Sequence, residues 1–170
     1  MLDDIYMGIY SVWHGQPQSG KTTFLLELRD YLNCIEPNNY AALYINLKRK
    51  APYVYKDQEA GMAAIVSELD SACLSTFGIS FDALNQTKEI SPLCRLKVAL
   101  TVVSQELYKK GRKFILFIDN IDTVGGQLLP SVLAYMLLFK NINYYVAKFV
   151  QGTQNAGVGS SQNLSFWLDL

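Results

Sequence analysis

Residues 15–22 have the types and spacing needed to bind a phosphate group and a metal ion. They read Gly-Gln-Pro-Gln-Ser-Gly-Lys-Thr and match the pattern G-x-x-x-x-G-K-S/T at every fixed position. The glycines let the backbone curl so that amide N–H groups point at phosphate oxygens, and the start of a following helix adds the positive end of its dipole. Lys21 would then reach the terminal phosphates, and the Thr22 hydroxyl would bind Mg²⁺. An ordinary turn that happens to contain a lysine is the alternative.

A second residue able to do chemistry is Asp119, which follows the apolar run 114–118. Five consecutive apolar residues predict a strand that is buried on both faces. In open parallel sheets, ligands bind at the carboxyl ends of the strands. We therefore expect Asp119 to lie at the same edge of the sheet as residues 15–22, where its carboxylate would hold Mg²⁺ opposite Thr22. A strand-terminal aspartate that only caps a turn is the alternative.

The elements that must position these residues follow from the hydrophobic pattern. Residues 9–13 predict a buried strand before the glycine-rich loop, and residues 23–32 predict a helix after it. Further strands are predicted at 40–47, 144–150 and 164–170, and further helices at 57–77, 92–110 and 130–141. Strands that alternate with helices predict an α/β protein with a mainly parallel sheet and helices on both of its faces.

The composition predicts a single domain over residues 1–170. Fifteen acidic residues balance fifteen lysines and arginines, so no global basic field favours nucleic acid or an anionic membrane. The three cysteines fit no disulfide framework and no metal motif. Neither a signal peptide nor an apolar run of membrane-spanning length is visible. We expect an intracellular protein, and we expect the single histidine, His14, to be a packed residue at a strand end.

Residues 15–22 and Asp119, together with the strands and helices predicted around them, resemble the additional-strand (ASCE) division of P-loop NTPases. This division includes the AAA+ and STAND ATPases, and the resemblance covers most of the chain. It implies a three-layer α/β/α sandwich with strand order 5-1-4-3-2, in which the 144–150 strand lies between the first and third strands. It also implies ATP and Mg²⁺ as cofactors, with Thr22 and Asp119 as metal ligands. The nucleotide-binding residues that it implies are Gly15, Gln16, Pro17, Gln18, Ser19, Gly20, Lys21, Thr22 and Thr23.

The residues expected to act in hydrolysis, beside Lys21, depart in part from the family pattern. The resemblance implies that a polar residue after the fourth strand senses the γ-phosphate, with Thr153 as the first choice and Asn155 as the second. Asn120 stands where active AAA+ enzymes usually have glutamate, and an amide can orient water but cannot accept its proton. Asp122 is a candidate substitute, although the chemistry of a turn explains it as well.

The small helical lid of AAA+ enzymes, with its arginine, has no counterpart in the sequence. Either the family lacks the lid, or the chain is the N-terminal part of a longer protein. Residues 152–153 and 19–22 also resemble Crinkler-type effector NTPase domains of eukaryotic microbes. Delivery as an effector therefore stays open beside a cytoplasmic location.

Several functions remain open at this point. The leading hypothesis is an ATP–Mg²⁺ binding domain that hydrolyses ATP slowly and controls a protein partner or an attached domain. A nucleotide-gated switch that barely hydrolyses ATP is the second, and Asn120 favours it. A small-molecule kinase ranks lower because the arginines are scattered. A loop that serves only as scaffold is the fourth reading. GTP in place of ATP stays open, although the guanine-recognition motif of GTPases is absent from the sequence.

Overall fold

The computed structural model describes residues 2–7, 11–15, 18–50, 58–81, 91–124, 129–130, 132 and 144–151. In these residues four strands form one parallel sheet in the order β1-β4-β3-β2. The strands are β1 (Ser11–Gly15), β2 (Tyr40–Asn46), β3 (Lys113–Asp119) and β4 (Tyr144–Gln151). The position of β4 between β1 and β3 agrees with the position expected for residues 144–150.

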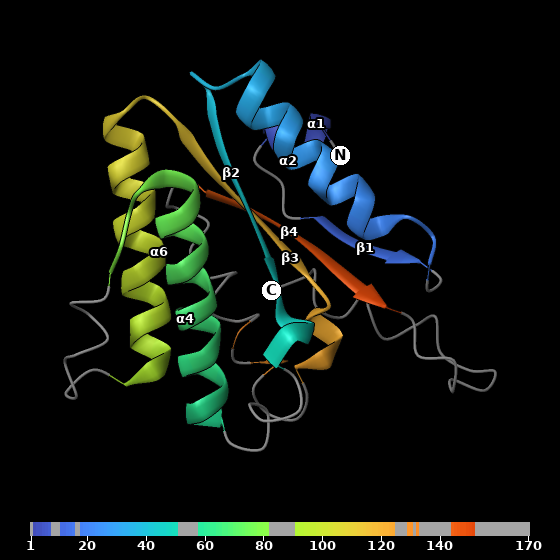
Figure 1. Ribbon diagram of the computed structural model, residues 1–170, viewed down its shortest axis with the longest axis vertical. Coiled ribbons are helices and arrows are strands. Elements are labelled where there is room, and N and C mark those ends of the chain that lie inside the picture. The colour runs from blue at the N-terminus through green and yellow to red at the C-terminus, as the bar shows by residue number, and fades with distance from the viewer. Residues whose placement is uncertain are drawn as a thin grey trace.

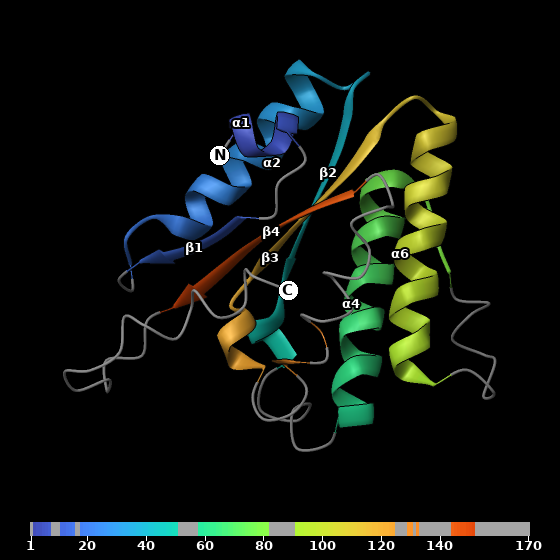
Figure 2. The same ribbon diagram turned by 180° about the vertical axis from the view of Figure 1, so that it is seen from behind.

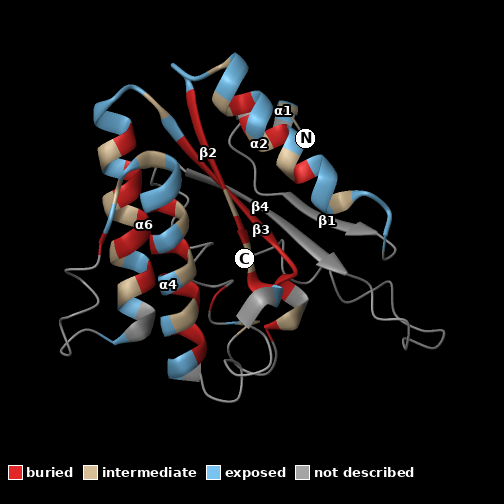
Figure 3. Cartoon of the chain, in the orientation of Figure 1, coloured by how far each residue is buried: buried red, intermediate tan, exposed pale blue. Residues whose placement is uncertain are grey.

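Helices lie against both faces of this sheet. The described helices are α1 (Leu2–Met7), α2 (Lys21–Ile35), α4 (Gln58–Phe77) and α6 (Pro92–Lys109), with 3₁₀ turns η1 (Leu47–Lys50) and η2 (Ile121–Thr123). Helices α1 and α2 lie on one face, and α4 and α6 lie side by side on the other (Figures 1 and 2). Figure 3 shows that the buried residues of α4 and α6 run along the sides that face each other and the sheet.

The five-stranded sandwich with strand order 5-1-4-3-2 is wrong as a prediction, because the sheet of the described residues has four strands. Helix also exceeds strand here: the α-helices have 6, 15, 20 and 18 residues, and the strands 5, 7, 7 and 8. The expected fifth strand, residues 164–170, lies outside the described residues. An apolar run shows that a segment can bury side chains, but it does not show which partner strand the segment pairs with.

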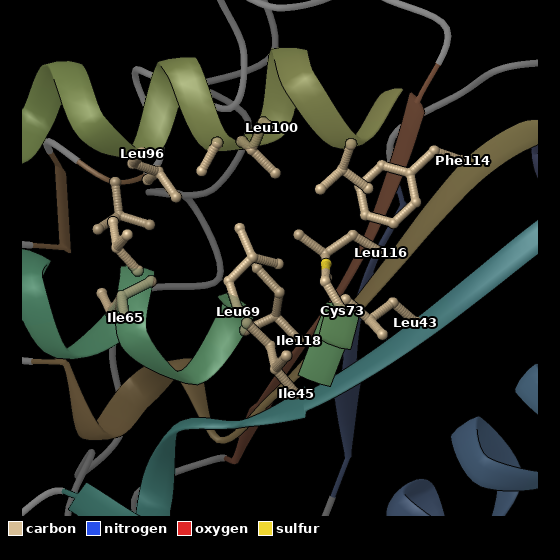
Figure 4. Packing of buried hydrophobic residues seen from close by; sticks show 14 of the residues in the cluster. Leu43, Ile45, Ile65, Leu69, Cys73, Leu96, Leu100, Phe114, Leu116 and Ile118 are labelled. Carbon is tan, nitrogen blue, oxygen red and sulfur yellow. The ribbon is translucent and has the colours of Figure 1, made fainter. Parts of the chain in front are cut away.

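The core is divided by the alternation of side chains along β2. Leu43 and Ile45 point to the α4 and α6 side, where they meet Leu69 and other buried residues (Figure 4). Tyr40 and Ala42 point to the α2 side and join a second, smaller cluster. Because both faces of the strand are covered, its sequence is apolar apart from the tyrosine hydroxyls and the terminal Asn46, as expected for a parallel sheet.

Helix α6 begins and ends where its sequence predicts. The hydroxyl of Ser91 accepts a hydrogen bond from the backbone N–H of Cys94, and a proline follows Ser91 at the first helical position. After the last turn, Gly111 adopts a φ of 75°, and the N–H of Arg112 bonds to the carbonyl of Leu107. A left-handed residue of this kind is the usual way to end a helix.

The outer edge of β2 is partly covered by a side chain of α2. The amide of Asn33 donates to the carbonyl of Ala42 at 2.8 Å and accepts from the N–H of Ala42 at 2.9 Å. An uncovered edge strand invites pairing with another chain, so this contact protects the edge as well as joining helix to sheet.

Candidate functional site

The carboxyl ends of the four strands lie at one edge of the sheet, and the glycine-rich loop follows the first of them. The parallel register pairs Gly15 of β1 with Gln151 of β4, and Asn46 of β2 with Asp119 of β3. Figure 1 shows β1 ending at this edge, with residues 18–20 of the loop leading into α2. The same edge therefore presents the loop and Asp119 together.

The described part of the loop is a tight turn into a helix. Gln18 and Gly20 have φ values of 61° and 81°, and α2 begins at Lys21. Glycine adopts such a φ without strain, which explains Gly20. No side chain caps the start of α2, and its first turn contains no acidic residue. The positive end of the helix dipole therefore faces the loop without a carboxylate beside it in that turn.

A pocket of about 220 Å³ opens at this turn. It is lined by Gln18, Ser19, Gly20, Lys21, Thr22, Thr23 and Asp119. Sites that enclose a drug-sized ligand measure roughly 300–1,000 Å³, so this pocket suits a smaller group such as phosphate. The side chain of Lys21 lies over the loop, and its Nζ donates to the hydroxyl of Ser19 at 3.1 Å.

Thr22 and Asp119 are in direct contact, although 97 positions separate them in the sequence. The hydroxyl of Thr22 donates to Oδ2 of Asp119 at 2.7 Å. The Asp119 side chain is otherwise enclosed, since the residue is only 3% exposed. The expectation that these two residues lie together at one edge of the sheet is confirmed.

Two further donors hold the Asp119 carboxylate. The hydroxyl of Tyr44 donates to the same Oδ2 at 2.8 Å, and the backbone N–H of Asn120 donates to Oδ1 at 2.9 Å. Hydrogen bonds to a carboxylate are stronger than those between neutral groups. Contacts from α2, β2 and its own strand end therefore keep this carboxylate in one orientation.

Asn120 has a structural part in this edge of the sheet. Its φ of 56° places it in the left-handed region, which asparagine tolerates better than most residues. Its Nδ2 donates to Oδ1 of Asn46 at 3.1 Å, and its carbonyl accepts from the hydroxyl of Thr123 at 2.6 Å. The residue is 5% exposed. The side-chain N–H group observed here is thus engaged with β2.

The other expected site residues lie partly outside the described structure. Gln16, Pro17, Thr153 and Asn155 lie outside the described residues, so their expected roles stay predictions. Asp122 lies in η2, but its side chain is among those not described, and the same holds for the side chain of His14 in β1.

Sequence reasoning missed Tyr44 and Asn46, which contact the centre of the site. Both lie on β2 near its carboxyl end, and Asn46 pairs with Asp119 in the register. Their signal was available as two polar groups at alternate positions at the end of an otherwise apolar strand. That signal could be interpreted only with the knowledge that β2 lies next to β3.

Two features are absent from the part of the chain that the structure describes. The described residues contain no group of three or more His, Cys, Asp or Glu side chains that could hold a metal ion. Among the described helices, none combines the length and the apolar character that crossing a bilayer requires. Comparison with known proteins adds no assignment: no family model matches the chain, and no curated protein matches it.

Proposed function

We propose that this chain is a P-loop nucleotide-binding domain that binds ATP with Mg²⁺, hydrolyses it slowly and thereby controls a protein partner or an attached domain. The observation that carries the proposal is the 2.7 Å hydrogen bond from the Thr22 hydroxyl to the Asp119 carboxylate, at the rim of the loop pocket. A hydroxyl and a carboxylate at one end of a phosphate-sized pocket are the protein groups that a magnesium–nucleotide complex needs.

The donor set fits Mg²⁺. The Thr22 hydroxyl donates its hydrogen bond to Asp119, so the lone pairs of its Oγ1 are available to a cation. Mg²⁺ prefers hard oxygen ligands, and it is usually held by one or two protein groups together with water and phosphate oxygens. A site of this kind does not need a cluster of three or more His, Cys, Asp or Glu side chains, and the described residues contain no such cluster.

The other half of the pocket fits an anion. The pocket is lined by Lys21 and by the loop residues that lead into α2, whose first turn has no acidic residue. Amide groups and a positive helix end stabilise phosphate charge, and the lysine adds a full positive charge. Bound Mg²⁺ would supply further neutralisation of the negative charge that develops on the phosphates. The chain's own contribution is to hold and orient the phosphates.

A nucleotide-gated switch with almost no hydrolysis is the second candidate, and the contacts of Asn120 favour it. The amide of Asn120 cannot accept a proton from water, and its N–H is directed at Asn46. Without a base at this position, hydrolysis depends on positioning and charge stabilisation alone. We therefore expect bound ATP to persist for many minutes.

The test is calorimetric titration with ATP, GTP and ADP, with and without Mg²⁺. Lys21→Ala removes the charge that lines the pocket, and we expect it to weaken triphosphate binding by about 2–3 kcal/mol, which is the scale of a lost charge-assisted contact. Lys113→Ala is the matched control, because Lys113 is exposed at the opposite end of β3. Equal affinity of the parent and Lys21→Ala for ATP would overturn the proposal.

Hydrolysis is measured separately, by single-turnover release of phosphate from bound ATP. Slow release supports the ATPase, whereas intact bound ATP at the end of the experiment supports the switch. The titration with GTP decides whether the base is selected. Phosphorylation of a nucleoside panel would instead indicate a kinase.

A further inference from the structure

We infer that Tyr44 is a positioning residue for the Asp119 carboxylate and thereby sets how tightly this site takes up Mg²⁺ with its nucleotide. The inference rests on the proposed function and deepens it. It concerns β2, an element to which the sequence motif assigns no part in the site. The evidence is a continuous chain of hydrogen bonds that runs from the backbone of Lys48 through Asn46 and Tyr44 to Asp119.

The direction of each hydrogen bond follows from the backbone N–H of Lys48, which can only donate. The backbone N–H of Lys48 donates to Oδ1 of Asn46 at 3.0 Å, so this atom is the carbonyl oxygen of the amide. The Nδ2 of Asn46 must then be the group 3.2 Å from the Tyr44 hydroxyl, to which it donates. Because the hydroxyl oxygen accepts this bond, its single proton is left for Oδ2 of Asp119, 2.8 Å away.

Asn120 strengthens the same assignment. Its Nδ2 donates to Oδ1 of Asn46 at 3.1 Å, so two donors meet at that oxygen and the Asn46 amide has one orientation. The Tyr44 ring itself packs against the core cluster on the α2 side, which anchors the hydroxyl. The packing of the Tyr44 ring and the fixed Asn46 amide thus direct the Tyr44 hydroxyl at Asp119.

The consequence concerns the metal. Groups that orient a metal-binding carboxylate from behind are typically worth about 10–100-fold in metal affinity. Here Oδ2 accepts hydrogen bonds from the hydroxyls of Thr22 and Tyr44, and Oδ1 accepts one from the backbone N–H of Asn120. Loss of the Tyr44 hydroxyl would leave the carboxylate with two of the three hydrogen bonds that the described residues give it. The carboxylate could then rotate about the Cβ–Cγ bond of Asp119. The side of the pocket formed by Lys21 and the loop would stay intact.

The experiment compares Tyr44→Phe with Tyr40→Phe. Tyr40 lies on the same strand and the same face, four positions before Tyr44, and it is buried in the same cluster. Both variants lose one hydroxyl and keep the ring. Calorimetry with ATP is carried out over a Mg²⁺ titration and again in EDTA, and unfolding temperatures are recorded without nucleotide.

We expect Tyr44→Phe to raise the Mg²⁺ concentration needed for half-maximal ATP binding by about tenfold or more. Its ATP affinity in EDTA should stay within about twofold of the parent, and Tyr40→Phe should match the parent in both conditions. Asn46→Asp is a second variant: it replaces the donor that faces Tyr44 by an acceptor, which competes with Asp119 for the Tyr44 proton. We expect it to shift the Mg²⁺ requirement in the same direction.

An unchanged Mg²⁺ requirement in Tyr44→Phe would overturn this inference, and the proposed function would survive if Lys21→Ala still lost ATP. Equal weakening of ATP binding with and without Mg²⁺ would show a purely structural role for Tyr44 and would also overturn it. A parent chain that binds no nucleotide would remove both proposals together.

Discussion

Asn120→Glu introduces the residue that active AAA+ enzymes, which the sequence resembles, usually have at this position, and we expect it to destabilise the protein without creating an efficient hydrolase. The position has a φ of 56°. A left-handed backbone costs an ordinary residue about 1–2 kcal/mol, and asparagine pays less of this cost than glutamate. Loss of the hydrogen bond from the Asn120 side-chain amide to Asn46 removes about 1 kcal/mol more. Only the difference between the two residues counts, so the free energy of unfolding should fall by about 2 kcal/mol in all.

The assay is thermal unfolding of the parent, Asn120→Glu and Asn120→Gly. For a domain of this size each kcal/mol lowers the unfolding temperature by about 2–4 °C, so we expect a fall of about 4–8 °C for the glutamate variant. Glycine loses the same amide but adopts the left-handed backbone without strain, so its fall should be smaller. Single-turnover phosphate release should not rise above the parent rate, because the new carboxylate is held at a nearly buried position beside β2.

A glutamate variant as stable as the parent would refute the reasoning about the backbone at residue 120. A variant that is stable and also releases phosphate much faster would show that the position faces the reacting phosphate, and that its amide in the parent is the element that limits hydrolysis. An equal fall in unfolding temperature in the glutamate and glycine variants would assign the whole effect to the lost hydrogen bond between Asn120 and Asn46.

Two further predictions concern the scaffold. Asn33→Ala removes both hydrogen bonds to the outer edge of β2 and should cost about 1–2 kcal/mol of unfolding free energy, measured by urea denaturation against Asn38→Ala, an exposed turn residue. Burial, and secondarily the charge of Asp70, raises the pKa of the Cys73 thiol from 9.0 to about 12. Between these two pH values the unfolded chain loses a proton that the folded chain keeps. Stability should therefore fall as the pH rises above 9.0, by about 1.4 kcal/mol per unit at most, relative to Cys73→Ala.

Each of these predictions has a clear contrary result. Equal urea midpoints for Asn33→Ala and the parent would show that the amide contact does not stabilise the edge of β2. A pH slope that is unchanged in Cys73→Ala would show that this thiol titrates alike in both states.

The exposed thiols of Cys34 and Cys94 should react with a thiol reagent in the native protein, whereas Cys73 should react only after unfolding.

Much of the local structure could be predicted from the sequence. The predicted helix over 57–77 is α4, which begins at Gln58, and the predicted strand over 40–47 is β2, which ends at Asn46. The sequence predicts the first strand at 9–13, whereas β1 is Ser11–Gly15, and the short helix α1 precedes it. Boundaries shift in this way because the last residues of an element are chosen by tertiary contacts as much as by local preference.

The loop, the helix that follows it and the strand that ends in Asp119 were determined by the sequence alone, because each depends on residues that are close together in the chain. Only the tertiary structure decided that Tyr44 and Asn46 surround that aspartate. Those contacts depend on which strand pairs with β3 and in which register, and they join residues 74 and 75 positions apart. A pattern read along the chain contains no information on that pairing until the strands are assembled.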